Sequence, residues 1–434
     1  MSKWPQNTIE IPYGRTKLRV PDWVPDTEDI LIPGPFDDVE PDVILNDALD
    51  NPVDSQPVEE IFSPGDRLLC VIPDLTRRAA VSYYLPLLLE RLEEAGHLPQ
   101  DINILVGLGI HRLMEEEELT EHVGQWVKDR YSVINHDPDN ADELSYIGDT
   151  PGGIPVSVNS EAVRADGIIL TGGVTYHYFA GYGGGRKGIL PGIASRQTCI
   201  DNHKLVVRWR RGELNGELGP GALMGNPVHE QMLWACSVLP RIFSLNVVTD
   251  PDGKVFHSSA GEVANAHQRA CKALDRAFRK TLGEKGKLVL AGAGGWPKDL
   301  NFVQAHKSLF SAHRAVDEGG VVILAASCDD GAGHPDMMSW FRECKTKEQW
   351  LSALDSRYQI NGQTAYSTWL RVNRTKTCLV SELPPEDVLA MGMIPCGDLD
   401  EAFGQAEQIL GELPGPVVMP DAGDILVDID KIKE

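Results

Sequence analysis

The chain has 434 residues, 42% of them hydrophobic and 24% charged, which is typical of a soluble globular protein and excludes a disordered or fibrous one. Its net charge of −24 disfavours nucleic acid and anionic membranes as partners. The N-terminus lacks a signal-peptide core, and no apolar run approaches the roughly 20 residues of a membrane-spanning helix. The eight cysteines form no C-x-x-C pair. We therefore expect a cytoplasmic protein with reduced thiols and no membrane partner.

The first half of the chain reads as alternating strands and helices. After an opening hairpin and an acidic loop, apolar runs at 68–72, 101–106 and 131–135 predict buried strands. A helix is expected to end at Gly96, and another to begin near Glu115. This alternation indicates βαβ units on a parallel sheet. Residues that follow the strands should therefore lie at the carboxyl edge of the sheet, where ligands bind.

The second half repeats this pattern. A helix is predicted over about 260–282, then strands at 287–291 and 321–325, a helix over about 398–413 capped by Asp398 with Glu401, and an edge strand from residue 415 onward. We therefore expect an α/β fold with two α/β domains and mainly parallel sheets. The predicted domains are residues 1–273 and 274–434.

Two polar turns follow predicted strands. Asp74, Thr76 and Arg77 begin the sequence DLTRR, which can position a phosphate or carboxylate; a solvated turn with a local Asp–Arg pair explains it equally well. His111 ends the sequence GLGIH. It can act as a general base, or it can cap the helix that begins near Glu115.

A glycine-rich loop at 171–203 carries the strongest functional signal. It holds His177, Lys187 and His203, which offer a proton-transfer group, a nucleophilic amine and a metal ligand. Gly184 and Gly185 permit a close backbone approach to a ligand. The loop is neither a Walker A motif nor a G-x-G-x-x-G motif.

A fourth polar segment lies at 294–307. If a helix begins near Asp299, Gln304 and Lys307 share one face, where an amide and an ammonium suit a substrate carboxylate; an ordinary exposed face is the alternative. A further set of histidines is predicted to be structural or exposed. They are His97, His136, His229, His257, His267, His313 and His334.

Together the four segments resemble the lactate racemase family, which uses a nickel-pincer nucleotide. The blocks are DLTR, GIHR, the run HYFAGYGGGRKGILPGI followed by NH, and GGWPKD with Gln304 and Lys307. The resemblance implies an active site in a cleft between the two domains. The N-terminal domain would carry the cofactor-anchoring loop and the C-terminal domain would contribute substrate-binding residues.

The resemblance also implies roles for individual residues. Lys187 would hold the cofactor covalently, His203 would be the protein ligand to nickel, and His111 and His177 would be the acid/base pair. Arg77, Gln304 and Lys307 would bind substrate. Further cofactor contacts would come from Asp74, Thr76, Arg77, Gly184 and Gly185.

The implied activity is racemisation or epimerisation of a 2-hydroxy acid. One imidazole takes the hydroxyl proton while hydride passes to the cofactor, a 2-keto acid forms, and hydride returns to its other face. Proteins that make the cofactor are implied partners, and an oligomer is possible.

The chain departs from the family pattern at several positions. Arg78 stands where the family commonly has proline, and Val303 stands where lactate racemases often have tyrosine. An aromatic residue is expected near Tyr358. The substrate can therefore be lactate or a larger, aromatic, dicarboxylic or sugar acid.

Two alternatives remain open at this stage. A cofactor-dependent 2-hydroxyacid dehydrogenase would stop at the keto acid. A non-catalytic two-domain protein would only bind an anion, without nickel and without a modified Lys187.

Overall fold

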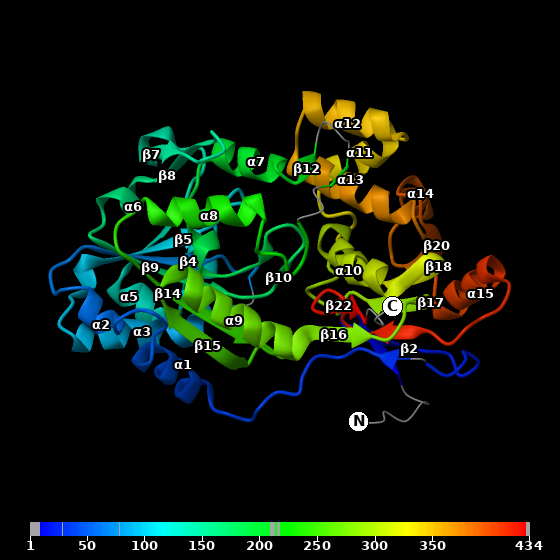
Figure 1. Cartoon of the computed structure of the whole chain (residues 1–434), viewed down its shortest axis with the longest axis horizontal. Helices are drawn as coiled ribbons and strands as arrows, with labels where there is room; N and C mark the ends of the chain where they lie inside the picture. Colours follow the sequence, from blue (N-terminus) through cyan, green and yellow to red (C-terminus); the bar gives the residue numbers. More distant parts are fainter. Residues whose placement is uncertain (1–8, 28, 78, 209–212, 215–217, 431–434) are drawn as a thin grey trace. The chain divides into compact units, whose positions relative to one another are not determined.

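The computed structural model describes residues 9–27, 29–77, 79–208, 213–214 and 218–430 (Figure 1). The chain divides into two compact units. The N-terminal unit comprises Gly34–Val207 and Asn215–Ala277, and the C-terminal unit comprises Met1–Pro33, Arg208–Leu214 and Phe278–Glu434. Both units are discontinuous in sequence, and the segment before residue 34 belongs to the C-terminal unit. The domain boundary between residues 273 and 274 and the cleft between the domains stay predictions.

A six-stranded sheet forms the centre of the N-terminal unit, in the order β15-β14-β9-β4-β5-β6. Five of these strands are parallel, and β15 alone runs antiparallel, beside β14. The strands are β4 (Leu68–Pro73), β5 (Ile102–Gly107), β6 (Ser132–Asn135), β9 (Gly167–Gly173), β14 (Ile242–Thr249) and β15 (Val255–Gly261). The three strands predicted at 68–72, 101–106 and 131–135 are confirmed.

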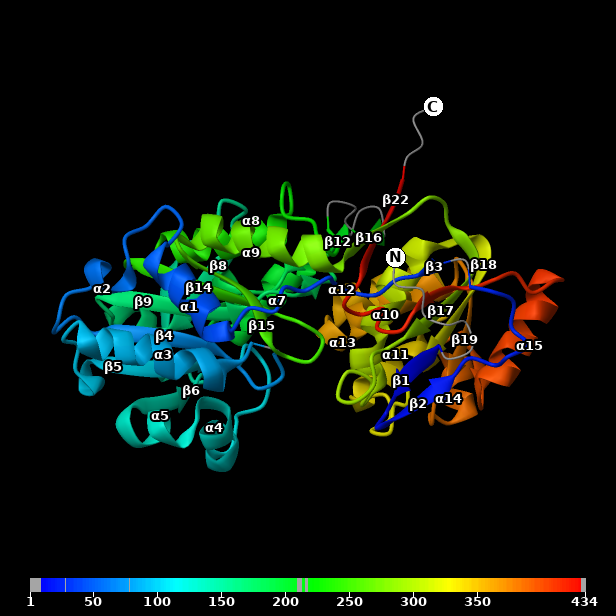
Figure 2. The same ribbon diagram turned by 90° about the horizontal axis from the view of Figure 1, so that it is seen from below.

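Helices cover both faces of this sheet (Figure 2). On one face, α3 (Val81–Glu94) buries a stripe of side chains at intervals of three and four residues, including Tyr84, Leu85, Leu88 and Leu92. The predicted stop at Gly96 is confirmed, since this glycine follows the helix with φ +95°. Other elements of this unit are α1 (Pro41–Asp50), α2 (Val58–Ile61), α4 (Glu116–Val123), α5 (Gln125–Arg130), β7 (Leu144–Asp149), β8 (Pro155–Asn159), α6 (Ser160–Arg164), α7 (Arg196–Lys204), α8 (Pro227–Ser237) and α9 (Val263–Phe278).

The C-terminal unit holds a second six-stranded sheet, in the order β20-β19-β18-β17-β21-β3, whose neighbouring strands are all parallel. The strands are β3 (Asp29–Ile30), β17 (Gly286–Gly292), β18 (Val316–Ala325), β19 (Lys376–Val380), β20 (Ile394–Cys396) and β21 (Val417–Met419). The predicted edge position of β21 is wrong. The short strand β3, from the start of the chain, pairs outside it and makes β21 an interior strand.

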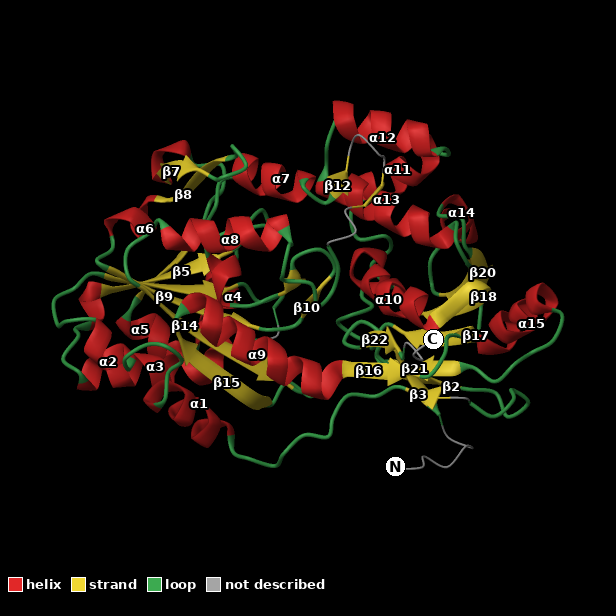
Figure 3. Ribbon diagram, viewed as in Figure 1, coloured by secondary structure: helices red, strands yellow, loops and turns green. Residues whose placement is uncertain are grey.

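Alternate side chains of β17 point to opposite faces of this sheet. Val289 and Ala291 join the core that includes α10 (Phe302–Ala315), whereas Leu288 and Leu290 join the core that includes α15 (Leu399–Leu410). Figure 3 shows these two helices on opposite sides of the strands. The other elements are β1 (Glu10–Tyr13) and β2 (Thr16–Arg19), which form the predicted hairpin, and α11 (Pro335–Glu343), α12 (Lys347–Ser356), α13 (Ile360–Val372) and α14 (Pro385–Ala390).

Two predicted helices differ from the structure at their ends. The segment 260–282 is α9 followed by a strand, β16 (Arg279–Leu282), because its backbone pairs with β22 (Leu426–Ile429) near the end of the chain. Helix α15 ends at Leu410 rather than 413, because Gly411 takes φ +81° and terminates it. Its predicted cap is present, since the Asp398 carboxylate accepts from the Glu401 N–H at 2.8 Å. None of the helices in the described ranges has the length and apolar character needed to cross a membrane.

Candidate active site

The carboxyl ends of the parallel strands place the predicted site residues of the N-terminal unit along one sheet edge. The turn after β4 carries Asp74, the turn after β5 carries His111, and the segment after β9 leads to His177. The Gly109 N–H donates to the Gly192 carbonyl at 2.8 Å, which ties the turn after β5 to the segment that follows Lys187. These residues therefore lie at the carboxyl edge of the sheet, as expected from the sequence.

Asp74 and His111 form a hydrogen-bonded pair. The Asp74 side chain is only 4% exposed, and its Oδ2 lies 3.1 Å from His111 Nδ1. Its Oδ1 accepts from the Thr76 N–H at 2.8 Å and from the Thr76 hydroxyl. Since His111 pairs with Asp74 and the cap of α4 is Glu115, the alternative that His111 caps this helix is excluded.

The charge state of Asp74 follows from its surroundings. Burial alone would raise the pKa of the Asp74 carboxyl, but the hydrogen bond from His111 and the charge of Arg77 outweigh burial and hold this pKa well below its usual range. Because the carboxylate only accepts, we assign the hydrogen of a neutral His111 to Nδ1. Its Nε2 then carries a lone pair that can accept a proton.

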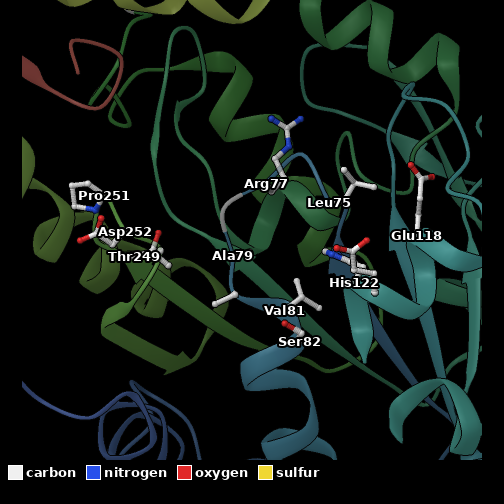
Figure 4. Close-up of a pocket in the computed structure, with 13 residues that line it drawn as sticks. Leu75, Arg77, Ala79, Val81, Ser82, Glu118, His122, Thr249, Pro251 and Asp252 are labelled. Carbon is white, nitrogen blue, oxygen red and sulfur yellow. The ribbon is translucent and has the colours of Figure 1, made fainter. Parts of the chain in front are cut away.

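Arg77 lies beside the same carboxylate, with its Nε 3.8 Å from Asp74 Oδ2, and its side chain is 44% exposed. It borders a cavity of about 520 Å³ (Figure 4). Helix α3 begins at this cavity without a capping side chain at Ala80, so its first N–H groups and Arg77 lie there together with the acidic lining residues from α4 and the β14–β15 turn. Arg78, where proline is common in the family, lies outside the described residues.

The remaining walls of the cavity come from α4 and from the turn between β14 and β15. The lining residues are Leu75, Arg77, Ala79, Ala80, Val81, Ser82, Glu118, Glu121, His122, Thr249, Pro251, Asp252 and Gly253. His122, which the sequence analysis missed, bonds through Nε2 to the Pro73 carbonyl at 2.8 Å. The only feature of the sequence that marks His122 is its place in the helical segment between Leu119 and Val123, both of which are buried.

The glycine-rich loop brings three predicted residues around one buried ring, that of Phe179. The ring centroids of His177 and His203 lie 4.5 and 4.9 Å from its centroid. Lys187 Nζ lies 5.9 Å from the same centroid. Sequence reasoning missed Phe179, because an apolar residue in a glycine-rich loop carries no chemical signal of its own.

His177 and His203 differ in which ring nitrogen carries the hydrogen. His177 Nδ1 accepts from the Ala180 N–H at 3.2 Å, so the hydrogen of a neutral His177 is on Nε2. His203 Nδ1 lies 2.6 Å from the Cys199 carbonyl one helical turn earlier, so this nitrogen donates and Nε2 keeps a lone pair. Burial, with the charge of Lys187 adding to it, lowers the pKa of His203 to about 4, so the imidazole is neutral at pH 7.

Gly184 and Gly185 lie against the sheet. A Cβ on Gly185 would meet Ser244 Oγ at 2.4 Å, and one on Gly184 would meet Val174 Cγ2 at 2.7 Å. The Gly185 N–H also donates to Asn246 Oδ1 at 2.9 Å. Packing against β14 and against Val174, the residue after β9, therefore accounts for both glycines, and their contact with a cofactor stays a prediction.

In the C-terminal unit, Gln304 and Lys307 lie on α10, which begins after its cap Asn301. The Lys307 ammonium donates to Gln304 Oε1 at 2.6 Å, so the predicted common face is confirmed. Asp299 is fully buried and its Oδ2 accepts from the N–H groups of Gly14 and Ser327. The predicted substrate contacts of Gln304 and Lys307 stay predictions.

The described residues contain no group of three or more His, Cys, Asp or Glu side chains that could hold a metal ion by themselves. The residues around Phe179 offer two imidazoles and one amine, and the Asp74–His111 pair offers a third imidazole.

Comparison with known proteins gives two family matches. Residues 25–213 match the lactate racemase N-terminal domain, and residues 282–427 match the lactate racemase C-terminal domain. The lactate racemase of Thermoanaerobacterium thermosaccharolyticum is 30% identical over 435 residues, which cover 96% of this chain and 99% of that protein. The lactate racemase of Lactiplantibacillus plantarum is 29% identical over 391 residues, or 88% of this chain and 89% of that protein.

Solved structures agree with this result. The lactate racemase apoprotein from T. thermosaccharolyticum superposes with a TM-score of 0.89 at 30% identity, covering 97% of this chain and 99% of that one. A protein from Thermotoga maritima superposes with a TM-score of 0.67 at 20% identity, covering 92% of this chain and 100% of that one, and shares the fold alone.

Proposed function

Because the chain belongs to the lactate racemase family and is therefore an isomerase, we propose that it inverts the hydroxyl-bearing carbon of a 2-hydroxy acid, lactate or a larger one. The observation that supports this best is the gathering of His177, Lys187 and His203 around Phe179. An amine and two imidazoles on one buried ring exceed what a passive anion receptor needs. The cytoplasm is the proposed compartment, where its eight free cysteines would stay reduced.

The residues of this site fit a nickel-pincer nucleotide. Lys187 would hold it covalently, and His203 would bind nickel through Nε2, the nitrogen that its bond to the Cys199 carbonyl leaves available. Asp74, Thr76, Arg77, Gly184 and Gly185 are the proposed further contacts. When bound, this cofactor supplies a hydride acceptor. Proteins that make it are the proposed partners.

The two other imidazoles would handle the hydroxyl proton. His111 would take it at Nε2, and the Asp74 carboxylate would stabilise the imidazolium that forms. A flat 2-keto acid results when the proton and a hydride have left the same carbinol group.

His177 would serve the opposite enantiomer. To accept a proton at Nε2, it must move its own hydrogen to Nδ1 and give up the 3.2 Å bond from Ala180. That bond is between neutral groups, so its loss costs about 1 kcal/mol.

Arg77, Gln304 and Lys307 are the proposed contacts to the substrate carboxylate and hydroxyl. Val303, which lies next to Gln304, is partly buried against the core of the C-terminal unit. A valine in place of the family's frequent tyrosine leaves more space, so we propose a substrate range that extends beyond lactate.

Inversion in D₂O tests the reaction. The chain is expressed with the cofactor-making proteins and given single enantiomers of lactate and of longer, aromatic, dicarboxylic and sugar 2-hydroxy acids, without added electron acceptor. We expect at least one acid to racemise and to keep protium at C2, because the hydrogen moves as hydride. Accumulation of keto acid would favour a dehydrogenase, and deuterium at C2 would exclude hydride transfer.

A further inference from the structure

Arg186 lies next to Lys187 and is fully buried in the N-terminal unit. In the described part of the chain, no carboxylate lies within ion-pair distance of its guanidinium. Burial lowers the pKa of Arg186 to about 10, which leaves the side chain charged at neutral pH. A buried cation of this kind is costly unless all its donors find partners.

At least four of the five N–H donors of the guanidinium have acceptors, and three of these acceptors are carbonyls of the loop. Nη2 donates to Ala180 at 3.0 Å and to Tyr182 at 3.1 Å, and Nη1 donates to Gly183 at 3.1 Å. These residues lie between Phe179 and Lys187, so Arg186 folds the loop back onto itself. Arginine alone among side chains supplies five donors in a fixed fork.

Two imidazoles from separate helices complete the surroundings of the guanidinium. Nε donates to His229 Nδ1 on α8 at 2.6 Å, and Nη1 lies 2.7 Å from His267 Nε2 on α9. The same His267 nitrogen is 2.6 Å from the Gly183 carbonyl. A neutral Nε2 can accept from the guanidinium or donate to this carbonyl, but not both, and either bond holds His267 against the loop. Burial and the charge of Arg186 lower the pKa of His229 to about 3 and that of His267 well below its ordinary value, so both rings are neutral.

We infer that Arg186 is a positioning residue: with His229 and His267 it fixes the loop that presents Phe179 and Lys187. Asn226 supports the same loop, since its amide donates to the Phe179 carbonyl at 2.8 Å while its Oδ1 caps α8. His229, predicted as structural or exposed, is thus an acceptor for this cation, and His267, predicted likewise, lies against the same guanidinium. The consequence for Lys187 as an attachment point rests on the proposed function.

A matched pair at position 229 tests the inference. His229→Asn keeps an acceptor close to the Nδ1 position, whereas His229→Leu has a similar size and no acceptor. Arg186→Met removes all five donors, and Arg241→Met, at an exposed ion pair with Asp66, is the control. Amide exchange in residues 179–185 of the full-length protein without cofactor is measured by mass spectrometry, with β4 as the internal reference.

We expect exchange of residues 179–185 to accelerate by about tenfold or more in Arg186→Met and His229→Leu, the factor for losing one hydrogen bond to a charged group. Exchange in β4 should stay unchanged, and His229→Asn and Arg241→Met should resemble the parent chain. Parent-like exchange in Arg186→Met, or equal acceleration in His229→Asn and His229→Leu, would overturn the inference.

A second measurement follows the initial rate of adduct formation on Lys187 when the cofactor-making proteins are present. It should fall about tenfold in Arg186→Met and His229→Leu and recover in His229→Asn. If the parent chain takes no adduct, the proposed function fails, while the exchange result still decides the role of Arg186. Adduct formation at the parent rate in both Arg186→Met and His229→Leu would contradict the claim that Arg186 positions Lys187. It would leave the effect of Arg186 on residues 179–185 to the exchange measurement.

Discussion

Replacement of Asp74 by asparagine should impair both the chemistry of His111 and the stability of the fold. The Asp74 carboxylate accepts from His111 Nδ1 at 3.1 Å and is 4% exposed on its side chain. Asparagine has nearly the same shape, but its amide can donate to Nδ1 and so favour the tautomer with hydrogen on Nε2. In that tautomer His111 cannot take the hydroxyl proton.

The size of the effect follows from the bond that is lost. A hydrogen bond to a charged group is worth about 1.5–3 kcal/mol, which corresponds to a fall in kcat of about 10- to 100-fold. Asp74→Asn should also lower the free energy of unfolding at pH 7. An unfolded aspartate has a pKa of about 3.9, and the pKa of Asp74 is lower in the folded protein. The Asp74 carboxylate therefore stabilises the fold above about pH 3.9, and this contribution is lost as the pH falls below that value.

The assay compares kcat for both enantiomers with urea unfolding at pH 7 and pH 3.5. Asp139→Asn, which breaks an exposed ion pair with Arg196, is the matched control and should leave both quantities nearly unchanged. A parent-like kcat in Asp74→Asn with a fully loaded cofactor would refute the assignment of His111 as a base oriented by Asp74.

Three further predictions concern the same unit. His111→Gln and His177→Gln should keep the Lys187 adduct in intact mass but lose turnover by about 100-fold or more, and full activity in either variant would refute the two-base scheme. Gly185→Ala should lower the free energy of unfolding of the cofactor-free protein by about 1–3 kcal/mol, because its Cβ would meet Ser244 Oγ at 2.4 Å; a parent-like Tm would contradict this packing. The pKa of His203 is about 4 when folded and near 6.5 when unfolded, so the unfolded chain binds more protons between these values and the free energy of unfolding should fall as the pH drops from 6.5 towards 4. His203→Gln should make this fall shallower in urea titrations, and an unchanged slope would contradict the lowered pKa.

The elements that the sequence predicted are those with strong local signals. Strands β4, β5 and β6 are short apolar runs bounded by turns, and the parallel order of the sheet follows from their alternation with helices. From that topology alone, Asp74 and His111 were expected at one edge, and the structure brings them into hydrogen-bonding contact.

What the sequence missed depends on pairing between distant segments. Strand β16 forms because it meets β22, and β21 is interior because β3 arrives from the start of the chain. The same holds for side chains. Arg186 looks like one more basic residue of its loop, and only the packed fold brings His229 and His267 to it.

The covalent state of Lys187 tests the central proposal most directly. The full chain is matured with the cofactor-making proteins and digested, and the peptide that contains Lys187 is weighed while nickel is measured in the intact protein. We predict an added mass on Lys187 with equimolar nickel, both absent from Lys187→Ala and both kept in Lys254→Ala, whose lysine pairs with Asp38 at the surface. An unmodified Lys187 in nickel-free protein after full maturation would contradict the proposal.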